Sequence, residues 1–372
     1  MSPSIRFPEF TGEWKEERLS EIADIYKGAG ISKDQLSDNG EPCILYGELY
    51  TKYKTETITE VISRTDIDNT KLVRSKANDV IIPCSGETAE DIATARCVIK
   101  DGILLGGDLN IIRLHNYDGS FVSYQLNGKR KYDIAKVAQG VSVVHLYGEH
   151  LKGVKTVNPC LAEQKKISRF LSLLDERIAV QNRLIDRLQS LMIGIRHRII
   201  NEAKGKIVCL CEVSDIYQPQ TISSADLTET GYPVYGANGI IGHYTSYNHE
   251  AEQVCITCRG NTCGGVNYTK SKSWITGNAM VVNVDRYQNI VSKRYLYHYL
   301  SNCDFNSIIS GSGQPQIVRA PLAKFKIILP TVMQQYKIAH CLDVIQNKIN
   351  VNRNILNLLI RQKQYLLRKM FI

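Results

Sequence analysis

Two nine-residue stretches decide how this chain folds: Pro159-Cys160-Leu161-Ala162-Glu163-Gln164-Lys165-Lys166-Ile167 and Pro330-Thr331-Val332-Met333-Gln334-Gln335-Tyr336-Lys337-Ile338. They align at an offset of 330 − 159 = 171 residues, with proline, glutamine, lysine and isoleucine at matching positions. Proline is tolerated at the start of a helix, and Glu163 and Gln334 lie in the first turns. An internal repeat fixes the architecture of a chain. We therefore predict two copies of one unit, each ending in a helix.

Both helices carry the same heptad pattern. Apolar residues follow Ile167 and Ile338 at alternating intervals of four and three, and polar Gln181 and Asn352 interrupt the two runs at equivalent places, since 352 − 181 = 171. Such a seam predicts a helical partner, and helices of roughly 40 residues would be about 60 Å long. The alternative is core packing within one domain. The polar pair either fixes the register of the seam or faces solvent. The expected seam is Leu174, Ile178, Gln181, Ile185, Leu188, Ile345, Ile349, Asn352, Leu356 and Leu359.

The repeat also covers the globular parts. The segment 19–26 matches 210–217 at an offset of 191, and 80–86 matches 254–260 at an offset of 174. The falling offset places about twenty extra residues (191 − 171) in the middle of the first half. Short β-rich runs broken by Gly, Asn and Asp predict curved sheets. We expect an α+β fold: two similar globular domains (1–157 and 204–329) separated by two long helices (158–203 and 330–372) that form an antiparallel coiled coil.

Composition restricts the function. The 372 residues carry a formal net charge of +9, which slightly favours a polyanionic partner. Eleven cysteines are too few and too irregular for a disulfide framework, which suits a reducing cytoplasm. No apolar stretch approaches 18 residues, and the N-terminus lacks an export signal. We therefore expect a cytoplasmic protein without a membrane span.

No motif for catalysis, a cofactor or a metal is convincing. The segment Tyr26-Lys27-Gly28-Ala29-Gly30 imitates a turn of S-adenosylmethionine-dependent methyltransferases, but its repeat partner has no glycine. Cys255, Cys258 and Cys263 have a metal-like spacing that the first half does not repeat. A Gly-x4-Gly-Lys-Ser/Thr loop for ATP is absent. We expect no catalytic residue, no cofactor and no metal in this chain.

At this point the chain resembles the specificity (S) subunits of Type I restriction-modification systems. The resemblance rests on the segments 235–244 (YGANGIIGHY), 257–264 (TCRGNTCG) and 330–338, and it covers essentially the whole chain. It implies a non-catalytic subunit in which each domain reads one half of a split double-stranded DNA target and the helices set the spacer. It also implies two modification (methyltransferase) subunits docked on the helices, and ATP-dependent restriction subunits. In the first half, 27–50 departs from the Asn-Gly loop of the second, so we expect different half-sites.

Loop residues are the candidate DNA contacts. Basic and aromatic side chains interleave at Lys52-Tyr53-Lys54, which suits phosphate contact and stacking. Paired glutamines can read adenine edges, and the loops 139–142 and 313–316 occupy roughly corresponding positions. The candidates are Tyr46, Lys52, Lys54, Ser85, Arg96, Asn238, Tyr244, Arg259, Asn261, Gln314 and Gln316. The other hypothesis is a coiled-coil scaffold that binds proteins without DNA specificity.

Overall fold

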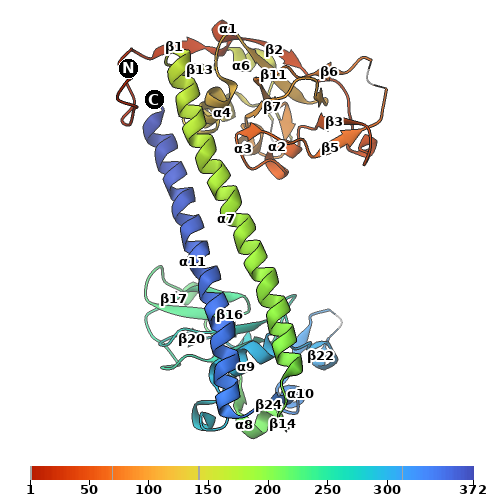
Figure 1. Cartoon of the computed structure of the whole chain (residues 1–372), viewed down its shortest axis with the longest axis vertical. Coiled ribbons are helices and arrows are strands. Elements are labelled where there is room, and N and C mark those ends of the chain that lie inside the picture. The colour runs from red at the N-terminus through yellow and green to blue at the C-terminus, as the bar shows by residue number, and fades with distance from the viewer. Residues whose placement is uncertain (1, 69, 141–142, 312) are drawn as a thin grey trace. The chain divides into compact units, whose positions relative to one another are not determined.

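The computed structural model describes residues 2–68, 70–140, 143–311 and 313–372. The chain divides into two compact units, Met1–Asn182 with Asn354–Ile372, and Arg183–Arg353. Each unit therefore contains one globular domain, part of the long helix α7 (Leu161–Glu202) and part of the long helix α11 (Val332–Met370). Figure 1 labels the helices and strands of both units.

The globular part of the first unit is built around two sheets. Strands of a five-stranded sheet follow the order β2-β11-β7-β9-β4, a four-stranded sheet has the order β5-β3-β10-β6, and β1-β13 and β8-β12 form two-stranded ladders. Central strand β7 is buried throughout, as its Val80-Ile81-Ile82 run requires. The elements are β1 (Lys15–Arg18), α1 (Leu19–Ile22), β2 (Ala23–Lys27), β3 (Glu41–Ile44), α2 (Glu48–Thr51), β4 (Thr57–Ile58), β5 (Ser63–Thr65), β6 (Val73–Arg74), β7 (Asp79–Pro83), β8 (Ser85–Gly86), α3 (Ala89–Ile92), β9 (Arg96–Val98), β10 (Leu104–Leu105), β11 (Leu109–Leu114), α4 (Gly119–Asn127), α5 (Lys131–Val137), β12 (Val144–His145), α6 (Gly148–Lys152) and β13 (Lys155–Asn158).

The second unit repeats this plan with fewer strands. Its sheets follow the orders β15-β21-β18-β19 and β17-β16-β20, and its ladders are β14-β24 and β22-β23. The elements are β14 (Lys206–Cys209), α8 (Leu210–Val213), β15 (Asp215–Tyr217), β16 (Tyr232–Gly236), β17 (Gly239–Tyr244), β18 (Val254–Thr257), β19 (Val266–Tyr268), β20 (Trp274–Ile275), β21 (Ala279–Asn283), α9 (Lys293–Leu300), β22 (Ile309–Ser310), β23 (Gln316–Ile317), α10 (Arg319–Ala323) and β24 (Lys326–Leu329).

A buried glutamine shows that the repeat is structural. Gln164 accepts a hydrogen bond from the backbone N–H of Asp118, the N-cap of α4, at 3.0 Å and donates to the Pro159 carbonyl at 2.8 Å. Its equivalent Gln335 accepts from the N–H of Ser292, the N-cap of α9, at 2.8 Å and donates to the Pro330 carbonyl at 2.9 Å. Each helix begins two residues after its proline, whereas the sequence placed the proline in the first turn.

Most of the extra residues of the first half form one insertion in its globular domain. The offset falls from 191 at Gly40 to 174 at Val80, so 17 of the twenty lie between β3 and β7. In the second unit β16 turns directly into β17 through Gly236–Gly239, and the two strands pair antiparallel. In the first unit β3 pairs instead with β5, after a detour through α2 and β4. This insertion gives the first domain surface that the second lacks.

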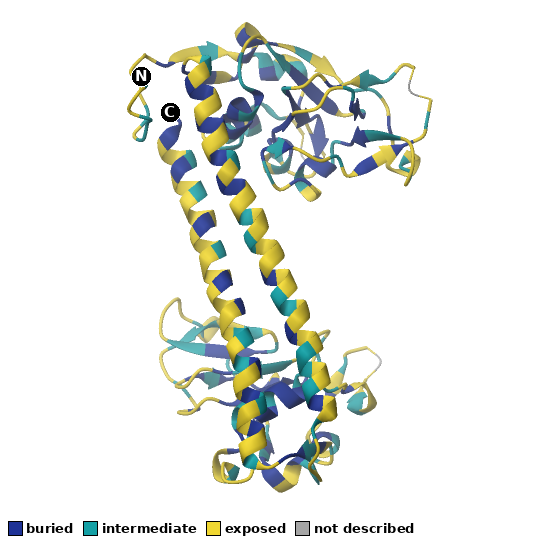
Figure 2. Cartoon of the chain, in the orientation of Figure 1, coloured by how far each residue is buried: buried dark blue, intermediate teal, exposed yellow. Residues whose placement is uncertain are grey.

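The predicted seam forms the buried face of the helix pair. In the first unit the starting turns of α7 and the final turns of α11 share one core, which includes Leu171, Leu174, Leu359 and Leu366. In the second unit the later turns of α7 and the first turns of α11 share another, centred on Met192, Leu342 and Ile349. The helices therefore pair antiparallel, as the heptads predicted. All ten seam residues are buried or half-buried, in contrast to the exposed outer positions (Figure 2).

Charged side chains join each domain to its helices; we call each such contact a seat. In the first seat Tyr124 of α4 donates to Asp175 of α7 at 2.7 Å, and the Lys363 ammonium lies 2.6 Å from carboxylate oxygens of both Asp175 and Glu56. Glu56 precedes β4 in the insertion. All these side chains are largely buried, so the lysine compensates two carboxylates away from water.

In the second seat the equivalent position of the short domain helix carries a histidine in place of a tyrosine. His298 of α9 corresponds to Tyr124, since 298 − 124 = 174, and its Nε2 lies 2.8 Å from a carboxylate oxygen of Asp343 on α11. Arg294 donates to the same carboxylate through Nε at 3.0 Å. Burial opposes the ionisation of Asp343, but the hydrogen bonds from His298 and Arg294 outweigh it and lower its pKa to about 2.

Candidate nucleic-acid interface

In the second domain, the turn between β16 and β17 exposes Asn238. Gly239 has a φ of +94°, a conformation that favours glycine, and this explains the Asn-Gly sequence at the turn. The turn is tied to the sheet because the Ala237 carbonyl accepts hydrogen bonds from the Thr257 hydroxyl and from the Asn267 amide. Asn238 is therefore held at a defined place beside the end of β18.

Two further loops meet at that end of β18. Arg259 and Gln316 form an antiparallel β-bridge, and Gly260 N–H donates to the Pro315 carbonyl at 3.0 Å. Arg259, Asn261, Gln314 and Gln316 are all exposed. The structure thus brings together two pairs of candidates that lie more than fifty residues apart in sequence. Guanidinium and amide groups on one surface suit contacts to phosphates and base edges.

Tyr244 has a different environment. It lies in β17, is half-buried, and packs edge-to-face on Trp274 with ring centroids 5.2 Å apart. Its ring supports the hairpin that carries Asn238. We therefore interpret it as a positioning residue rather than as a first choice for base contact.

The candidates of the first domain are divided between surface and interior. Lys54 is exposed and, within the described part of the chain, donates to the Thr51 carbonyl alone, at 3.0 Å. The Lys52 ammonium lies 2.6 Å from the buried carboxylate of Glu48. That carboxylate also accepts from Leu45 N–H and the Ser63 hydroxyl, so it holds Lys52 against the insertion. Lys54 is the freer cation of the two.

Tyr46 lines a cavity that the insertion creates. The cavity has a volume of about 820 Å³ and lies between α2 and the turns at 30–36 and 107–108; its lining residues are Gly30, Ile31, Ser32, Lys33, Leu36, Leu45, Tyr46, Gly47, Glu48, Thr51, Lys52, Gly107 and Asp108. Two lysines, Lys33 and Lys52, and two acids, Glu48 and Asp108, line it beside three aliphatic side chains. The half-buried Tyr46 also packs against the core of the sheet.

Two candidates of the first domain are interior residues. Arg96 lies in β9, is 9% exposed, and donates to the carbonyls of Leu49 and Tyr53 at 3.0 Å each. It holds the end of α2 in place. The sequence predicted that Arg96 lies on a loop, and this prediction is wrong because the residue is part of a strand. Ser85 lies in β8 and is also 9% exposed. The Arg96 guanidinium is engaged by backbone carbonyls, and both side chains are largely buried, so we do not expect either to contact DNA.

Ladder register corrects the alignment of the two glutamine loops. In the first unit His145 pairs with two residues, Gln139 on one side and Ser85 of β8 on the other. In the second unit Gln316 pairs in the same way with Ser310 and with Arg259. The equivalences are 310 − 139 = 171, 316 − 145 = 171 and 259 − 85 = 174. Gln139 therefore corresponds to Ser310, not to a glutamine. Val141 and Ser142, which the sequence analysis included in this loop, lie outside the described residues.

The corrected register brings out residues that sequence reasoning missed. His145 and Tyr147 are exposed and stack with ring centroids 6.2 Å apart. They line a cavity of about 310 Å³ together with Tyr26 and Lys27. The sequence did contain a signal for His145, because the repeat offset of 171 residues maps Gln316 onto it.

Cys258, one of the three cysteines with a metal-like spacing, is fully buried. Burial raises the pKa of the Cys258 thiol, which accepts a hydrogen bond from Gln218 at 3.2 Å. Within the described ranges, no three His, Cys, Asp or Glu side chains gather as they would around a metal ion. Among the same residues, no helix has both the length and the hydropathy that crossing a bilayer requires.

Comparison with known proteins agrees with this architecture. Residues 11–190 and 203–361 each match the family described as "Type I restriction modification DNA specificity domain". The two matches together span most of the chain. The chain therefore belongs to this family, and it contains two copies of the family's domain.

Individual relatives are more distant. The chain is 31% identical over 148 residues to the Type I restriction enzyme EcoprrI specificity subunit of Escherichia coli, but the alignment covers 38% of this chain and 36% of that relative. It is 22% identical to the Type I restriction enzyme MjaVIII specificity subunit of Methanocaldococcus jannaschii, over 94% of this chain and 89% of that one. The crystal structure of a Type I restriction-modification S subunit from M. genitalium matches all of this chain and 99% of its own, with a TM-score of 0.70 at 18% identity. That likeness establishes the fold.

Proposed function

We propose that this chain is the non-catalytic specificity subunit of a Type I restriction-modification complex and that each domain reads one half of a bipartite double-stranded DNA target. The observation that carries the proposal is the repeated ladder at the end of β8 and of β18. Its strand pairing is the same in both units, while the exposed His145 stands where the second unit has the exposed Gln316. A conserved frame with different side chains is what two readers of different sequences require.

DNA binding at several salt concentrations separates this proposal from the scaffold hypothesis. The logarithm of affinity should fall steeply with the logarithm of salt concentration, because each phosphate contact releases a counterion. The chain, assembled with its modification subunits, should also prefer one bipartite sequence selected from random duplex. Equal affinity for all duplexes in that complex would overturn the proposal. A scaffold would show no DNA binding at any salt concentration.

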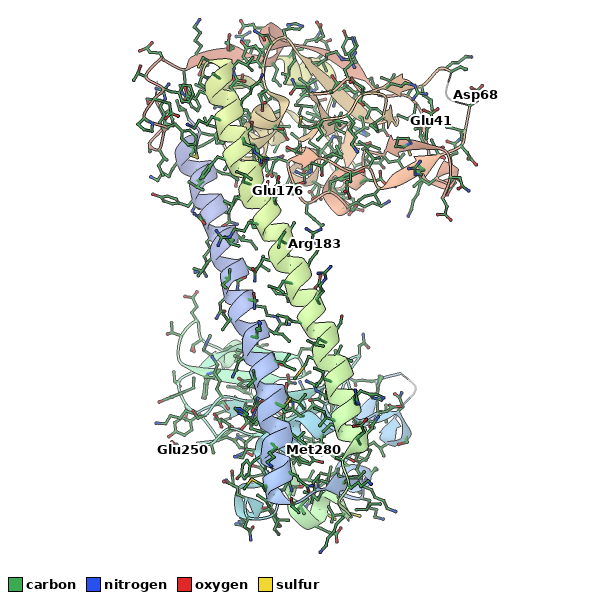
Figure 3. The ribbon with its side chains drawn as sticks, viewed as in Figure 1. Glu41, Asp68, Glu176, Arg183, Glu250 and Met280 are labelled. Carbon is green, nitrogen blue, oxygen red and sulfur yellow. The ribbon has the colours of Figure 1, made fainter. Side chains whose placement is uncertain are left out.

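The helices also offer two equivalent surfaces for the modification subunits. Leu173, Val180 and Leu184 of α7 are 46%, 54% and 39% exposed, and their equivalents Val344, Val351 and Ile355 of α11 are 54%, 56% and 37% exposed. The two residues of each pair are 171 positions apart in the sequence, which is the offset of the repeat. Charged side chains such as Glu176 and Arg183 of α7 are exposed as well (Figure 3). We interpret this repeated apolar stripe as the docking surface for two copies of one partner.

Single substitutions test the docking proposal. Val180→Asp and Val351→Asp should each remove one of two modification subunits, and the double variant should remove both, as native mass spectrometry would show. Asn350→Asp, also exposed on α11, is the matched control and should keep both. Retention of two partners by the double variant would contradict the assignment. The restriction subunits, which would bring ATP-dependent translocation, are then expected to join through the assembled complex.

Catalysis belongs to those partners in this proposal, and the chain itself needs no cofactor. The isolated chain is expected to transfer no methyl group to DNA. Incorporation of labelled methyl groups by the purified chain alone would contradict this.

A further inference from the structure

The two ladders present different chemistry at equivalent positions, and this difference specifies what each can recognise. Gly140 and Gly311 both have positive φ, at +126° and +91°, and each directly follows a paired residue, Gln139 or Ser310. With that register, Val143 corresponds to Gln314 and His145 to Gln316, since both pairs differ by 171. This correspondence follows from the strand pairing alone, whatever the target sequence is.

The second domain presents two free amides. Gln314 and Gln316 are exposed, and among the residues that the structure describes neither side-chain amide has a hydrogen-bond partner. A glutamine amide both donates and accepts, which matches the N6–H and N7 of adenine in the major groove. The adjacent exposed Arg259 supplies a cation for a phosphate or a guanine.

The first domain presents an aliphatic group and an imidazole instead. Val143 is 52% exposed and is not part of the hydrophobic core of this unit. The His145 ring stacks on Tyr147, with an angle of 25° between the planes, so its orientation is restrained. An exposed β-branched side chain can contact a thymine methyl group, and an imidazole N–H can donate to the N7 of a purine.

We propose that the first domain reads a thymine methyl group with Val143 and an adjacent purine N7 with His145, whereas the second domain reads adenine with Gln314 and Gln316. This inference rests on the proposed function and deepens it. Lys27 lines the cavity that His145 and Tyr147 also line. Its ammonium lies 4.0 Å from the Asp108 carboxylate, and both side chains are exposed. It is the cation best placed to contact the phosphate next to these bases.

Atom-by-atom changes in the DNA test this proposal. In the target selected by the complete chain with its modification subunits, each thymine of the first half-site is replaced singly by deoxyuridine, which lacks only the methyl group. At one position the wild type should lose roughly fourfold in affinity, the value of one buried methyl group. Val143→Ala should show no loss at that position. Val143→Thr, which keeps one methyl group, should show an intermediate loss.

His145 is tested with 7-deazapurines, which lack the N7 acceptor. One such replacement next to the sensitive thymine should weaken the wild type about fivefold, at the low end of the range for a base contact, and should leave His145→Ala unaffected. Gln314→Ala is the matched control: it should change discrimination in the second half-site only. Tyr132→Ala, 74% exposed on α5 of the same domain, should change neither.

The outcomes are distinct. If the Val143→Ala variant keeps the full deoxyuridine penalty, or if every thymine of the first half-site tolerates the replacement, the assignment of Val143 is wrong. A deazapurine penalty that persists in His145→Ala overturns the assignment of His145. Unchanged binding to the second half-site shows that each variant is folded. Failure of the proposed function looks different, because the wild-type complex would then select no bipartite sequence.

Discussion

The two seats share one contact and differ in the charges around it. In both, a carboxylate of a long helix meets the equivalent domain residue: Asp175 accepts from Tyr124, and Asp343 lies 2.8 Å from His298. In the first seat the cation, Lys363, comes from α11, and a second carboxylate, Glu56, comes from the domain. In the second seat the cation, Arg294, comes from the domain. The repeat has kept the helix carboxylate and moved the cation from a helix to the domain.

This difference makes each domain specific for its own part of the helices. Ser120 stands where the second domain has Arg294, since 294 − 120 = 174, and Met192 stands where α11 has Lys363, since 363 − 192 = 171. A domain placed on the other seat would leave a charge without compensation. Buried charges fix a specific pairing more than they stabilise it, because the cost of removing them from water offsets much of their attraction.

The largest expected effect follows from Lys363→Met, which introduces the residue found at the equivalent place in α7. Glu56 and Asp175 would lose their shared cation while remaining largely buried, so the first unit should lose about 3 kcal/mol of stability. Hydrogen exchange of the first unit, followed through a denaturant series, measures this. Adding Glu56→Gln and Asp175→Asn should restore most of the loss. A variant as stable as the wild type would remove the first seat from the comparison.

Gln335→Leu and Gln164→Leu should have the next largest effects. Gln335 bonds the N–H of Ser292 and the carbonyls of Ile290 and Pro330, whereas Gln164 bonds two backbone groups. Each unsatisfied buried group costs about 1–3 kcal/mol, so the second unit should suffer more than the first. Unfolding midpoints for the two units give the order, with exposed Gln362→Leu as control. Equal losses would show that the third bond is without effect.

Mild acid should act on the two seats in opposite directions. Burial lowers the pKa of His298 below 6.5, and its Nδ1 has no partner among the described residues. The unfolded chain therefore binds a proton first, and the second unit should lose stability as the pH falls below about 6.5. Burial also raises the pKa of Glu56 above 4.5, so the folded first unit binds a proton first and should gain stability as the pH falls toward 4.5.

Hydrogen exchange of each unit between pH 7 and pH 5 checks these signs. His298→Gln should reduce the pH dependence of the second unit. It should not abolish it, because burial also lowers the pKa of His249 in the same unit. The same slope in both units would contradict the proposed difference between the seats.

The smallest effect is expected from Lys54→Ala in the insertion. A freely exposed lysine on the phosphate backbone should weaken binding of all duplexes alike, and it should reduce the slope of log affinity against log salt by about one. Gln316→Ala in the second domain should instead relax one base position. Titrations at three salt concentrations distinguish them. A change in sequence preference in the Lys54 variant would make this lysine a reader of bases.

Much of the fold could be read from sequence because it depends on periodicity. The heptads of α7 and α11 and the offset of 171 needed only the positions of apolar and turn residues. The candidate site was harder. Arg96 looked like a loop cation, and only its burial beneath α2 shows that its donors are used by carbonyls. His145 looked like an ordinary histidine until its ladder partner identified it as the equivalent of Gln316.

By itself, the sequence determined that the chain holds two α+β domains and two antiparallel helices, because a repeated pattern can satisfy its apolar residues in only a few ways. The tertiary structure decided the register of the two ladders, the charges of the two seats and which candidates reach the surface. These depend on contacts between segments far apart in the chain, such as Glu56 with Lys363, and no local spacing encodes them.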